Sequence, residues 1–507
     1  MTQRRAGGTR RDFLKLAGAA AASTVVPEAR ASRAEKFCLM VDGADAVAGS
    51  GPVRRAARKL SQALAAKAVE AELVTSLGEA AGASFVVAAA RPHSEMAQQF
   101  RRTSAGQRAQ ELAGAESFRM TRAMRMNFGT MMAGETPAVL VEANDPLGFV
   151  YALLELAERV EYGAHPLAAL NPTQPVEEHP ANETRSVGRY FCCELEDKPW
   201  YYDRGFWGGY LDTLVASRFN RFCFAFGLEY DFPRGVTDDY FHLPYPYLVE
   251  VPGYEAVRVV QLRTADGQPL ATPAAVSGEE RRRNLETLQF VAAQTAARGL
   301  HFQLGIWTHA YAWTDSPNAY HRIEGLTPET HAKYCRDALA ILLKECPEIQ
   351  GLTMRVHGES GIPEGDYGFW RTLFEAIQGC GRTIEIDMHA KGVTETMIGI
   401  ATATGMPVKL GAKFSAEHQS LGYQQADIRA QEIPHGEPAA GGPFRFSSGS
   451  RLFTRYGYAD YLAEGAPYRL WFRLWLGTQR HLLSCDPETA AAYGRAAHFC
   501  GAAGIDL

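Results

Sequence analysis

The chain has 507 residues, a formal net charge of −5 at pH 7, and 46% apolar and 10% aromatic residues. This length and apolar content can bury large cores, and typical domain sizes suggest two folded units. The negative charge argues against nucleic acid or an anionic membrane surface as the partner, and nine cysteines without CxxC spacing give no disulfide framework and no zinc knuckle.

The first 31 residues have the composition of an export signal. Paired arginines at positions 10 and 11 stand before Phe13-Leu14-Lys15, an Ala-rich stretch (16–26) and the small residues of Ala29-Arg30-Ala31. This order resembles a twin-arginine signal peptide with its peptidase site, although a basic tail is the simpler alternative. The apolar stretch is too short for a permanent membrane anchor. We therefore expect residues 1–31 to be removed and the protein to be periplasmic or secreted.

Short apolar runs alternate with amphipathic helices between residues 36 and 170, which predicts a small α/β sandwich domain. The expected strands are Phe37–Val41, Ala71–Val74, Ser84–Ala90 and Pro137–Glu142, and the expected helices are 53–68 and 148–160. The segment Asp145–Arg159, followed by a linker at 171–185, resembles the end of the small domain that precedes the barrel in several exo-acting glycosidases, including α-glucuronidases and β-hexosaminidases.

Eight apolar runs follow the linker, each with a helical stretch or a long loop after it. Eight is the strand number of a (β/α)₈ TIM barrel, which we predict for residues 186–507. The expected barrel strands are Arg189–Cys193, Arg221–Phe226, His301–Ile306, Gly351–Val356, Thr383–Asp387, Pro407–Gly411, Phe444–Ser447 and Tyr468–Trp475.

Glu359 is the candidate general acid of a glycoside hydrolase. Hydrolysis of a glycosidic bond needs one carboxyl group that donates a proton and one that attacks or activates water. Glu359 follows the fourth expected strand, stands between Gly358 and Gly361, and has His357 two positions before it. A salt bridge is the ordinary role of such a residue, but carboxylates at the next two strand ends favour catalysis.

The candidates for the second carboxylate are Asp387 after the fifth strand and Glu417 after the sixth. The commonest clan of retaining barrel glycosidases has an Asn-Glu pair after the fourth strand and a nucleophile after the seventh, and this chain departs from both. The arrangement instead resembles α-glucuronidases, which invert the anomeric configuration. That resemblance implies the acid at Glu359 and the water-activating base at Asp387, Glu417 or both.

Further polar and aromatic residues stand at the expected strand ends, where barrel enzymes gather their reactive groups. Aromatic rings there could stack on sugar faces, and cations could pair with the carboxylate of a uronic acid or brace the barrel wall. The residues expected to bind substrate are Glu229, Tyr230, Trp307, His309, His357, His389, Lys391, Lys413, His418, Arg451, Arg455 and Trp475.

We therefore expect an exported glycoside hydrolase that acts on a carbohydrate and needs no cofactor or metal. A barrel sugar isomerase or hydrolase with a divalent metal is the main alternative, because the strand ends also carry histidines. Its His-x-His start is missing after the first strand, where Cys192 and Cys193 stand. A carbohydrate-binding barrel without activity is the third possibility.

Overall fold

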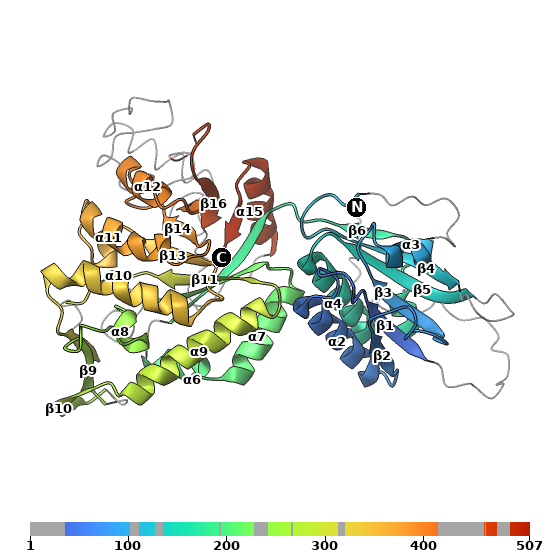
Figure 1. The fold of residues 1–507 in the computed structure, drawn as a ribbon, viewed down its shortest axis with the longest axis horizontal. Coiled ribbons are helices and arrows are strands. Elements are labelled where there is room, and N and C mark those ends of the chain that lie inside the picture. Colours follow the sequence, from blue (N-terminus) through green and yellow to red (C-terminus); the bar gives the residue numbers. More distant parts are fainter. Residues whose placement is uncertain are drawn as a thin grey trace, which may run out of the picture.

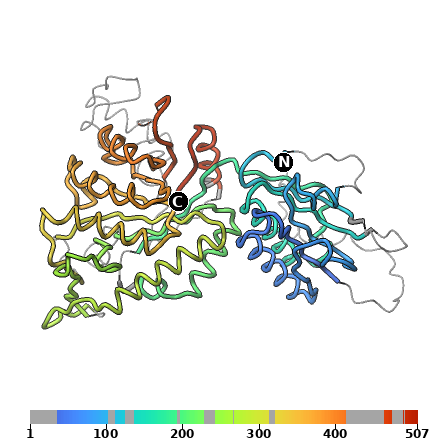
Figure 2. The backbone as a smooth tube through the Cα atoms, in the orientation of Figure 1, coloured from blue at the N-terminus to red at the C-terminus, as the bar shows by residue number. Residues whose placement is uncertain are grey.

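The computed structural model describes residues 36–101, 111–126, 135–191, 194–227, 242–264, 267–312, 320–413, 461, 463–473 and 487–507. These residues form two lobes, a six-stranded sheet with helices and a closed barrel of eight parallel strands (Figures 1 and 2). The predicted fold class, a TIM barrel preceded by an α/β domain, is confirmed. Within the described residues no helix is both long and apolar enough to cross a membrane. The expected signal peptide lies outside them.

The sheet of the first lobe is covered by helices on both faces. Along β1, Leu39 and Val41 share a core with α2 and α4, whereas Cys38 and Met40 share one with α3. The strand order is β2-β1-β3-β5-β4-β6, and β4 runs antiparallel to both of its neighbours. The elements are β1 (Phe37–Val41), α2 (Gly51–Ala66), β2 (Ala71–Val74), β3 (Phe85–Ala89), α3 (Glu95–Arg101), β4 (Phe118–Met126), β5 (Glu135–Ala143), α4 (Pro146–Tyr162), α5 (Pro166–Leu170) and β6 (Val176–Glu178).

The eight barrel strands are β7 (Thr184–Phe191), β8 (Arg221–Phe226), β11 (His301–Ile306), β13 (Gly351–Arg355), β14 (Glu385–His389), β15 (Val408–Lys413), β16 (Arg469–Arg473) and β17 (Gly504–Asp506). The predicted number is right, but the assignment of the last two strands is wrong. The seventh strand is β16, which was expected as the eighth, and Phe444–Ser447 lies outside the described residues. The eighth strand is β17, whose three residues pair with β16 and β7 and close the barrel.

The barrel helices and a small antiparallel sheet, β10-β9-β12, complete the second lobe. The sheet is formed by insertions after β8 and β11. These elements are α6 (Glu194–Tyr201), α7 (Arg204–Ala216), α8 (Tyr245–Leu248), β9 (Arg258–Arg263), β10 (Pro269–Ala275), α9 (Gly278–Ala296), β12 (His321–Glu324), α10 (Pro328–Glu345), α11 (Tyr367–Gln378), α12 (Glu395–Thr402) and α15 (Pro487–Phe499).

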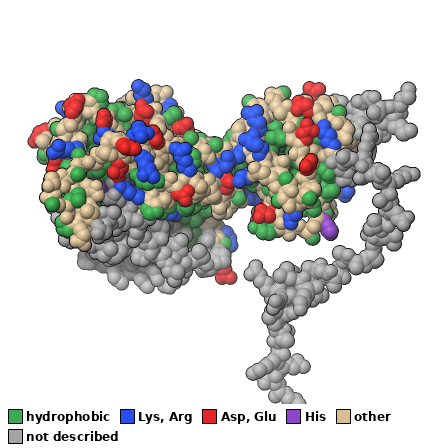
Figure 3. Space-filling model, turned by 90° about the horizontal axis from the view of Figure 1, so that it is seen from below, with side chains coloured by type: hydrophobic (Ala, Val, Ile, Leu, Met, Phe, Trp, Pro, Cys, Tyr) green, Lys and Arg blue, Asp and Glu red, His purple; other side chains and the backbone are tan. Residues whose placement is uncertain are grey.

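The first lobe lies against the amino-terminal ends of the first two barrel strands. Glu116 pairs with Arg185 at the start of β7 and accepts a hydrogen bond from Asn220, which immediately precedes β8 (2.7 Å). A second contact joins α2 to α7, where Lys59 pairs with Asp212 (2.7 Å). Figure 3 shows basic and acidic side chains interspersed over both lobes in that view. The first lobe thus contacts the amino-terminal side of the barrel, and the carboxyl-terminal face of the barrel points away from it.

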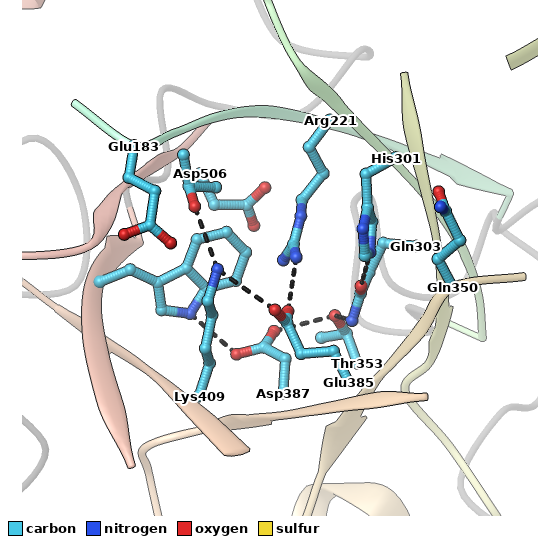
Figure 4. A network of polar contacts seen from close by, with 12 residues as sticks. Glu183, Arg221, His301, Gln303, Gln350, Thr353, Glu385, Asp387, Lys409 and Asp506 are labelled. Carbon is cyan, nitrogen blue, oxygen red and sulfur yellow. Dashed lines mark hydrogen bonds and ion pairs between the residues drawn. The ribbon is translucent and has the colours of Figure 1, made fainter. Parts of the chain in front are cut away.

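Side chains alternate along each barrel strand between the helix layer and the barrel interior. On β14, Ile386 and Met388 belong to the large apolar core, whereas Glu385 and Asp387 form polar contacts inside the barrel (Figure 4). The interior is thus filled with hydrogen-bonded and charged side chains instead of the branched apolar residues usual in such barrels.

Candidate active site

Glu359 lies on a short turn at the carboxyl-terminal end of the fourth barrel strand. β13 ends at Arg355, and a 3₁₀ turn follows at Gly358–Ser360. The Nδ1 atom of His357 accepts a hydrogen bond from the Glu359 amide (3.3 Å), which fixes the start of the turn. Gly361 ends it with φ +78°, and a side chain there would overlap Ala310. The turn is therefore anchored at both ends, and the Glu359 side chain remains 41% exposed.

The carboxylate of Glu359 forms an ion pair with a lysine from the next strand. Lys391, in the loop after β14, lies with Nζ 2.5 Å from Oε1 of Glu359. The other carboxylate oxygen lies 3.5 Å from Nε2 of His357 and 3.9 Å from a guanidinium nitrogen of Arg355. The same Arg355 nitrogen donates to the Glu359 main-chain oxygen (3.3 Å). Glu359 is thus surrounded by nitrogen atoms on one side and open to solvent on the other.

The loop that carries Lys391 is held from two sides. The hydroxyl of Tyr461 donates to the main-chain oxygens of Ala390 (2.5 Å) and Val393 (3.2 Å). Gly392 has φ +75°, and a side chain at this position would overlap the Cβ of His357. Only glycine fits this close approach without strain. These contacts therefore hold the backbone at Lys391 beside the turn of Glu359.

Asp387 lies inside the barrel and not at the strand tip, where the sequence placed it. β14 continues to His389, so Asp387 occupies the middle of the strand and is fully buried. Its two oxygens accept hydrogen bonds from Thr353 (2.8 Å), Trp471 (2.8 Å) and Arg473 (2.8 Å). Burial raises the pKa of Asp387 to about 6, and Arg473 opposes that rise. The structure thus corrects the expected position of Asp387, which lies below the strand tip and is held there by three hydrogen-bond donors.

Arg473 connects Asp387 to a carboxylate that the sequence analysis missed. The same guanidinium nitrogen of Arg473 lies 2.8 Å from Asp387 and 3.4 Å from Asp506 on β17. Space for the guanidinium is provided by Gly411, because a Cβ there would lie 2.9 Å from Nε of Arg473. Asp506 escaped notice because its strand has only three residues, too few to give a periodic signal.

Trp307 lies between the two arginines of the barrel interior. Its ring is 4.8 Å from the Arg355 guanidinium carbon and 5.1 Å from that of Arg473, at the range of a cation–π contact. The ring also packs on His389 (5.6 Å between centroids), which in turn packs on His357 (5.7 Å). Trp307 is 1% exposed. In this structure it therefore supports the charged residues below the mouth and presents no free face for a sugar.

A second charged layer lies at the amino-terminal end of the barrel. Arg221 and Lys409 both pair with Glu385, at 2.5 and 3.2 Å (Figure 4). Burial opposes ionisation of Glu385, but the two cations hold its pKa below the usual value. This layer closes the barrel beneath Asp387, so the interior is ion-paired over more than one level.

The structure brings together six of the predicted site residues: Glu359, His357, Lys391, His389, Trp307 and Asp387. His309 lies apart from them, packed against Trp370 of α11 (5.3 Å) and within 3.4 Å of the Tyr245 hydroxyl. Burial lowers the pKa of His309 to about 3, so its ring is neutral. Lys413 is the last residue of β15. The predicted residues that lie outside the described part of the chain are Glu229, Tyr230, Glu417, His418, Arg451, Arg455 and Trp475.

No group of three or more His, Cys, Asp and Glu side chains with the arrangement of a metal site occurs among the described residues. Two of the residues considered as ligands, Glu417 and His418, fall outside that part of the chain.

No family model and no curated protein matches the sequence. Many solved structures are similar to it, and two of them are described here. A GH138 enzyme targeting pectin rhamnogalacturonan II has a TM-score of 0.55 and 14% identity, and the match covers 93% of this chain and 57% of that one. CpGH84B has a TM-score of 0.43 and 8% identity, with 93% and 63% covered. The chain thus spans less than two thirds of either structure. At such identities the likeness to the GH138 enzyme concerns the fold alone.

Proposed function

We propose that this protein is a glycoside hydrolase with Glu359 as its general acid. The observation that carries the proposal is the position of Glu359, a half-exposed carboxylate at the carboxyl-terminal end of the fourth strand of a closed barrel. Barrel enzymes place their catalytic groups at this face. The likeness of the fold to a GH138 enzyme targeting pectin rhamnogalacturonan II supports the same class of reaction.

The proposed substrate is a uronic-acid-containing oligosaccharide or polysaccharide. Lys391 and Arg355 lie beside Glu359, and an ammonium or guanidinium group is the natural partner of a sugar carboxylate. The polysaccharide named for the GH138 enzyme, a rhamnogalacturonan, agrees with such a substrate. The paired arginines at positions 10 and 11 support export to the periplasm or beyond the cell, where polysaccharides are met.

We assign the water-activating base to Glu417 because Asp387 is enclosed by its three hydrogen-bond donors. Glu359 would donate a proton to the glycosidic oxygen as the bond from C1 to that oxygen breaks. Water would attack C1 from the opposite face and lose its proton to Glu417, with inversion of the anomeric configuration. Asp387 and Arg473 act as positioning residues that hold the strands beneath this site.

Hydrolysis of paired methyl glycosides, whose leaving oxygen needs a proton as the bond breaks, tests the proposal. Each pair should differ only at C6, where one member has a carboxylate and the other a hydroxymethyl group, for example a galacturonide and a galactoside. Unsaturated pectic oligosaccharides, and pectic oligosaccharides whose carboxylates have been reduced, should be assayed beside them. We expect cleavage of a uronide and a loss of at least about 100-fold in kcat with Glu359→Gln. Glu364→Gln, which changes an exposed carboxylate five residues later, serves as the control. If Glu359→Gln leaves hydrolysis unchanged, Glu359 is not the acid.

The product anomer separates the two mechanisms. NMR spectra recorded in the first minutes of hydrolysis should show the anomer opposite to that of the substrate, and Glu417→Gln should abolish turnover. A first product with the substrate's own configuration would require a carboxylate close enough to attack C1 directly, about 5 to 5.5 Å from the acid. That outcome would replace the inverting scheme.

A further inference from the structure

A cavity of about 650 Å³ lies beside the turn of Glu359, next to the loop that follows the third barrel strand. Its walls come from this loop and from the first two turns of α10 and α11, which lie side by side (Figure 1). Gly361, which ends the turn of Glu359, lines the cavity and lies against Ala310 of the loop. Small-molecule sites have volumes of about 300 to 1,000 Å³. The cavity is therefore large enough for a sugar residue, and it begins two positions from the proposed acid.

The order of the strands places this cavity and Lys391 on opposite sides of the fourth strand. In the barrel, β13 lies between β11 and β14. The loop after β14 carries Lys391, whereas residues 310–312, after β11, line the cavity. The main-chain oxygen of Ser360 accepts a hydrogen bond from the amide of His309 (2.7 Å), which joins the turn of Glu359 to the loop after β11. Glu359 therefore lies between its ion pair with Lys391 and the cavity.

Two polar side chains of the cavity are hydrogen-bond acceptors. Nε2 of His331 lies 2.7 Å from the main-chain oxygen of His309. Because that oxygen can only accept, Nε2 carries the proton, and Nδ1 of the neutral ring is an acceptor. Burial lowers the pKa of His331 to about 4, so the ring is neutral at pH 7. The second acceptor is Asp366, an exposed residue whose Oδ1 accepts from the amide of Phe369 (3.1 Å) at the start of α11.

Aromatic rings stand beside these acceptors. Tyr311, which is partly exposed, and Phe369 both line the cavity. The rings of Tyr311 and His331 meet edge to face with 4.7 Å between their centroids, so they form one wall. A sugar has hydroxyl groups that donate to acceptors and C–H faces that pack on aromatic rings. Among the residues that the structure describes, no lysine or arginine lines the cavity. A sugar carboxylate would therefore meet Asp366 unfavourably, and a neutral sugar would not.

We propose that this cavity binds a neutral sugar, the one that leaves when the glycosidic bond is cleaved. This inference rests on the proposed function, because it takes Glu359 as the acid. The acid protonates the oxygen of the leaving group, so the leaving sugar lies beside the acid. With a uronic acid on the side of Lys391 and a neutral sugar on the side of Tyr311, the bond between them lies at Glu359. The enzyme therefore cleaves the bond from a uronic acid to a neutral sugar, and a chain of uronic acids alone is a poor substrate.

A comparison of leaving groups tests this inference. Three kinds of substrate should carry the same uronic acid, joined to a methyl group, to galactose or rhamnose, or to a second uronic acid. We expect kcat/KM to be at least about 10-fold higher for a disaccharide with a neutral leaving sugar than for the other two kinds. Asp366→Asn removes the charge and keeps a residue that caps α11 well. This variant should raise kcat/KM for the substrate with two uronic acids at least about 3-fold, because the repulsion is gone.

Filling the cavity gives a second test. Ala332 lines the cavity from α10. Ala332→Trp should lower the ratio of kcat/KM for the disaccharide with a neutral leaving sugar to kcat/KM for the methyl glycoside at least about 10-fold. Lys333→Trp adds the same ring at the next, exposed position of the helix and is the matched control. Equal thermal unfolding temperatures of the two variants would show that folding is intact.

Binding can also be measured without hydrolysis. Saturation-transfer NMR with galactose and rhamnose on Glu359→Gln should show contact with at least one of these sugars. The contact should be lost when Ala332→Trp is added and kept when Lys333→Trp is added.

The outcomes separate this inference from the proposed function. An unchanged ratio with Ala332→Trp, or equal cleavage of the substrates with a neutral and an acidic leaving sugar, would overturn the inference while leaving Glu359 as the acid. Full activity of Glu359→Gln, or no hydrolysis of any glycoside, would overturn the proposed function and with it the leaving-sugar site, even if NMR shows a neutral sugar in the cavity.

Discussion

Replacing Arg473 by methionine removes the cation that lies between two buried carboxylates. Arg473 is 3% exposed, and Asp387 and Asp506 are 0% and 2% exposed. Methionine fills much of the same volume, so the main effect is electrostatic. Without the guanidinium group, each carboxylate must either remain charged in the barrel interior or take up a proton.

The expected destabilisation follows from the burial of the pair. Loss of one partner from a buried ion pair costs about 3 to 5 kcal/mol. The barrel from Thr184 to Leu507 has roughly 320 residues, and at about 2.1 cal/mol/K per residue its entropy of unfolding is about 0.7 kcal/mol/K. A loss of about 4 kcal/mol therefore lowers the unfolding temperature by about 6 °C. Near-ultraviolet circular dichroism is a suitable assay because Trp307 and Trp471 both pack on Arg473.

The destabilisation caused by Arg473→Met should be larger at high pH than at low pH. Because burial raises the pKa of Asp387 to about 6, its carboxylate is charged at pH 7.5 and largely protonated at pH 5. The contribution of its ion pair is thus present above about pH 6 and is lost as the pH falls through that value. The free energy of unfolding lost with Arg473→Met should be clearly smaller at pH 5 than at pH 7.5.

Arg469→Met is the matched control, since it lies on the same strand and removes an exposed pair with Glu183 (2.8 Å). Such surface pairs contribute about 1 kcal/mol or less. If Arg473→Met lowered the unfolding temperature no more than this control, or equally at both pH values, the buried pair would not stabilise the barrel as reasoned here.

Three further changes, the first with a matched control, test the barrel and its contact with the first lobe. Gly392→Ala should lower kcat/KM at least about 10-fold, because the new Cβ overlaps His357. The control is Gly365→Ala, which also lies at positive φ but in open space. It should lower only the free energy of unfolding, by about 1 to 2 kcal/mol, as measured by thermal unfolding. Removal of residues 503–507 deletes the eighth strand, and cooperative thermal unfolding of the barrel should be lost; a native transition would show that β17 is dispensable. Burial opposes ionisation of Asp212, but the cations around it hold its pKa below the usual value. Asp212→Asn should therefore lower the free energy of unfolding at pH 7, and urea titrations should show this loss shrinking as the pH falls below about 4.

The sequence alone determined the fold class and most of the elements. Phe37–Val41 and Ala71–Val74 are strands with the predicted bounds, and the predicted helices 53–68 and 148–160 correspond to α2 and α4. These elements follow from the spacing of apolar residues and from nearby turn residues, which are local properties of the chain. Six of the eight barrel strands overlap their predicted positions in the predicted order for the same reason.

Strand β17 and the buried position of Asp387 were decided only by the tertiary structure. Three residues form a barrel strand when neighbouring strands on both sides supply hydrogen bonds, and no local pattern reveals this. Strand β14 ends two residues later than expected, so Asp387 lies in the interior and not at the mouth of the barrel. Strand ends predicted from a sequence are uncertain by about this amount.

The contacts of Glu359 show the same division. Its place after the fourth strand could be read from an apolar run that ends before His357 and Gly358. Its pairing with Lys391, 32 positions later, depends on the register of β13 and β14, in which Arg355 lies opposite His389. The sequence therefore determined which residue reaches the mouth of the barrel. Closure of the sheet decided which charge lies beside that residue, because only pairing between strands fixes which side chains meet.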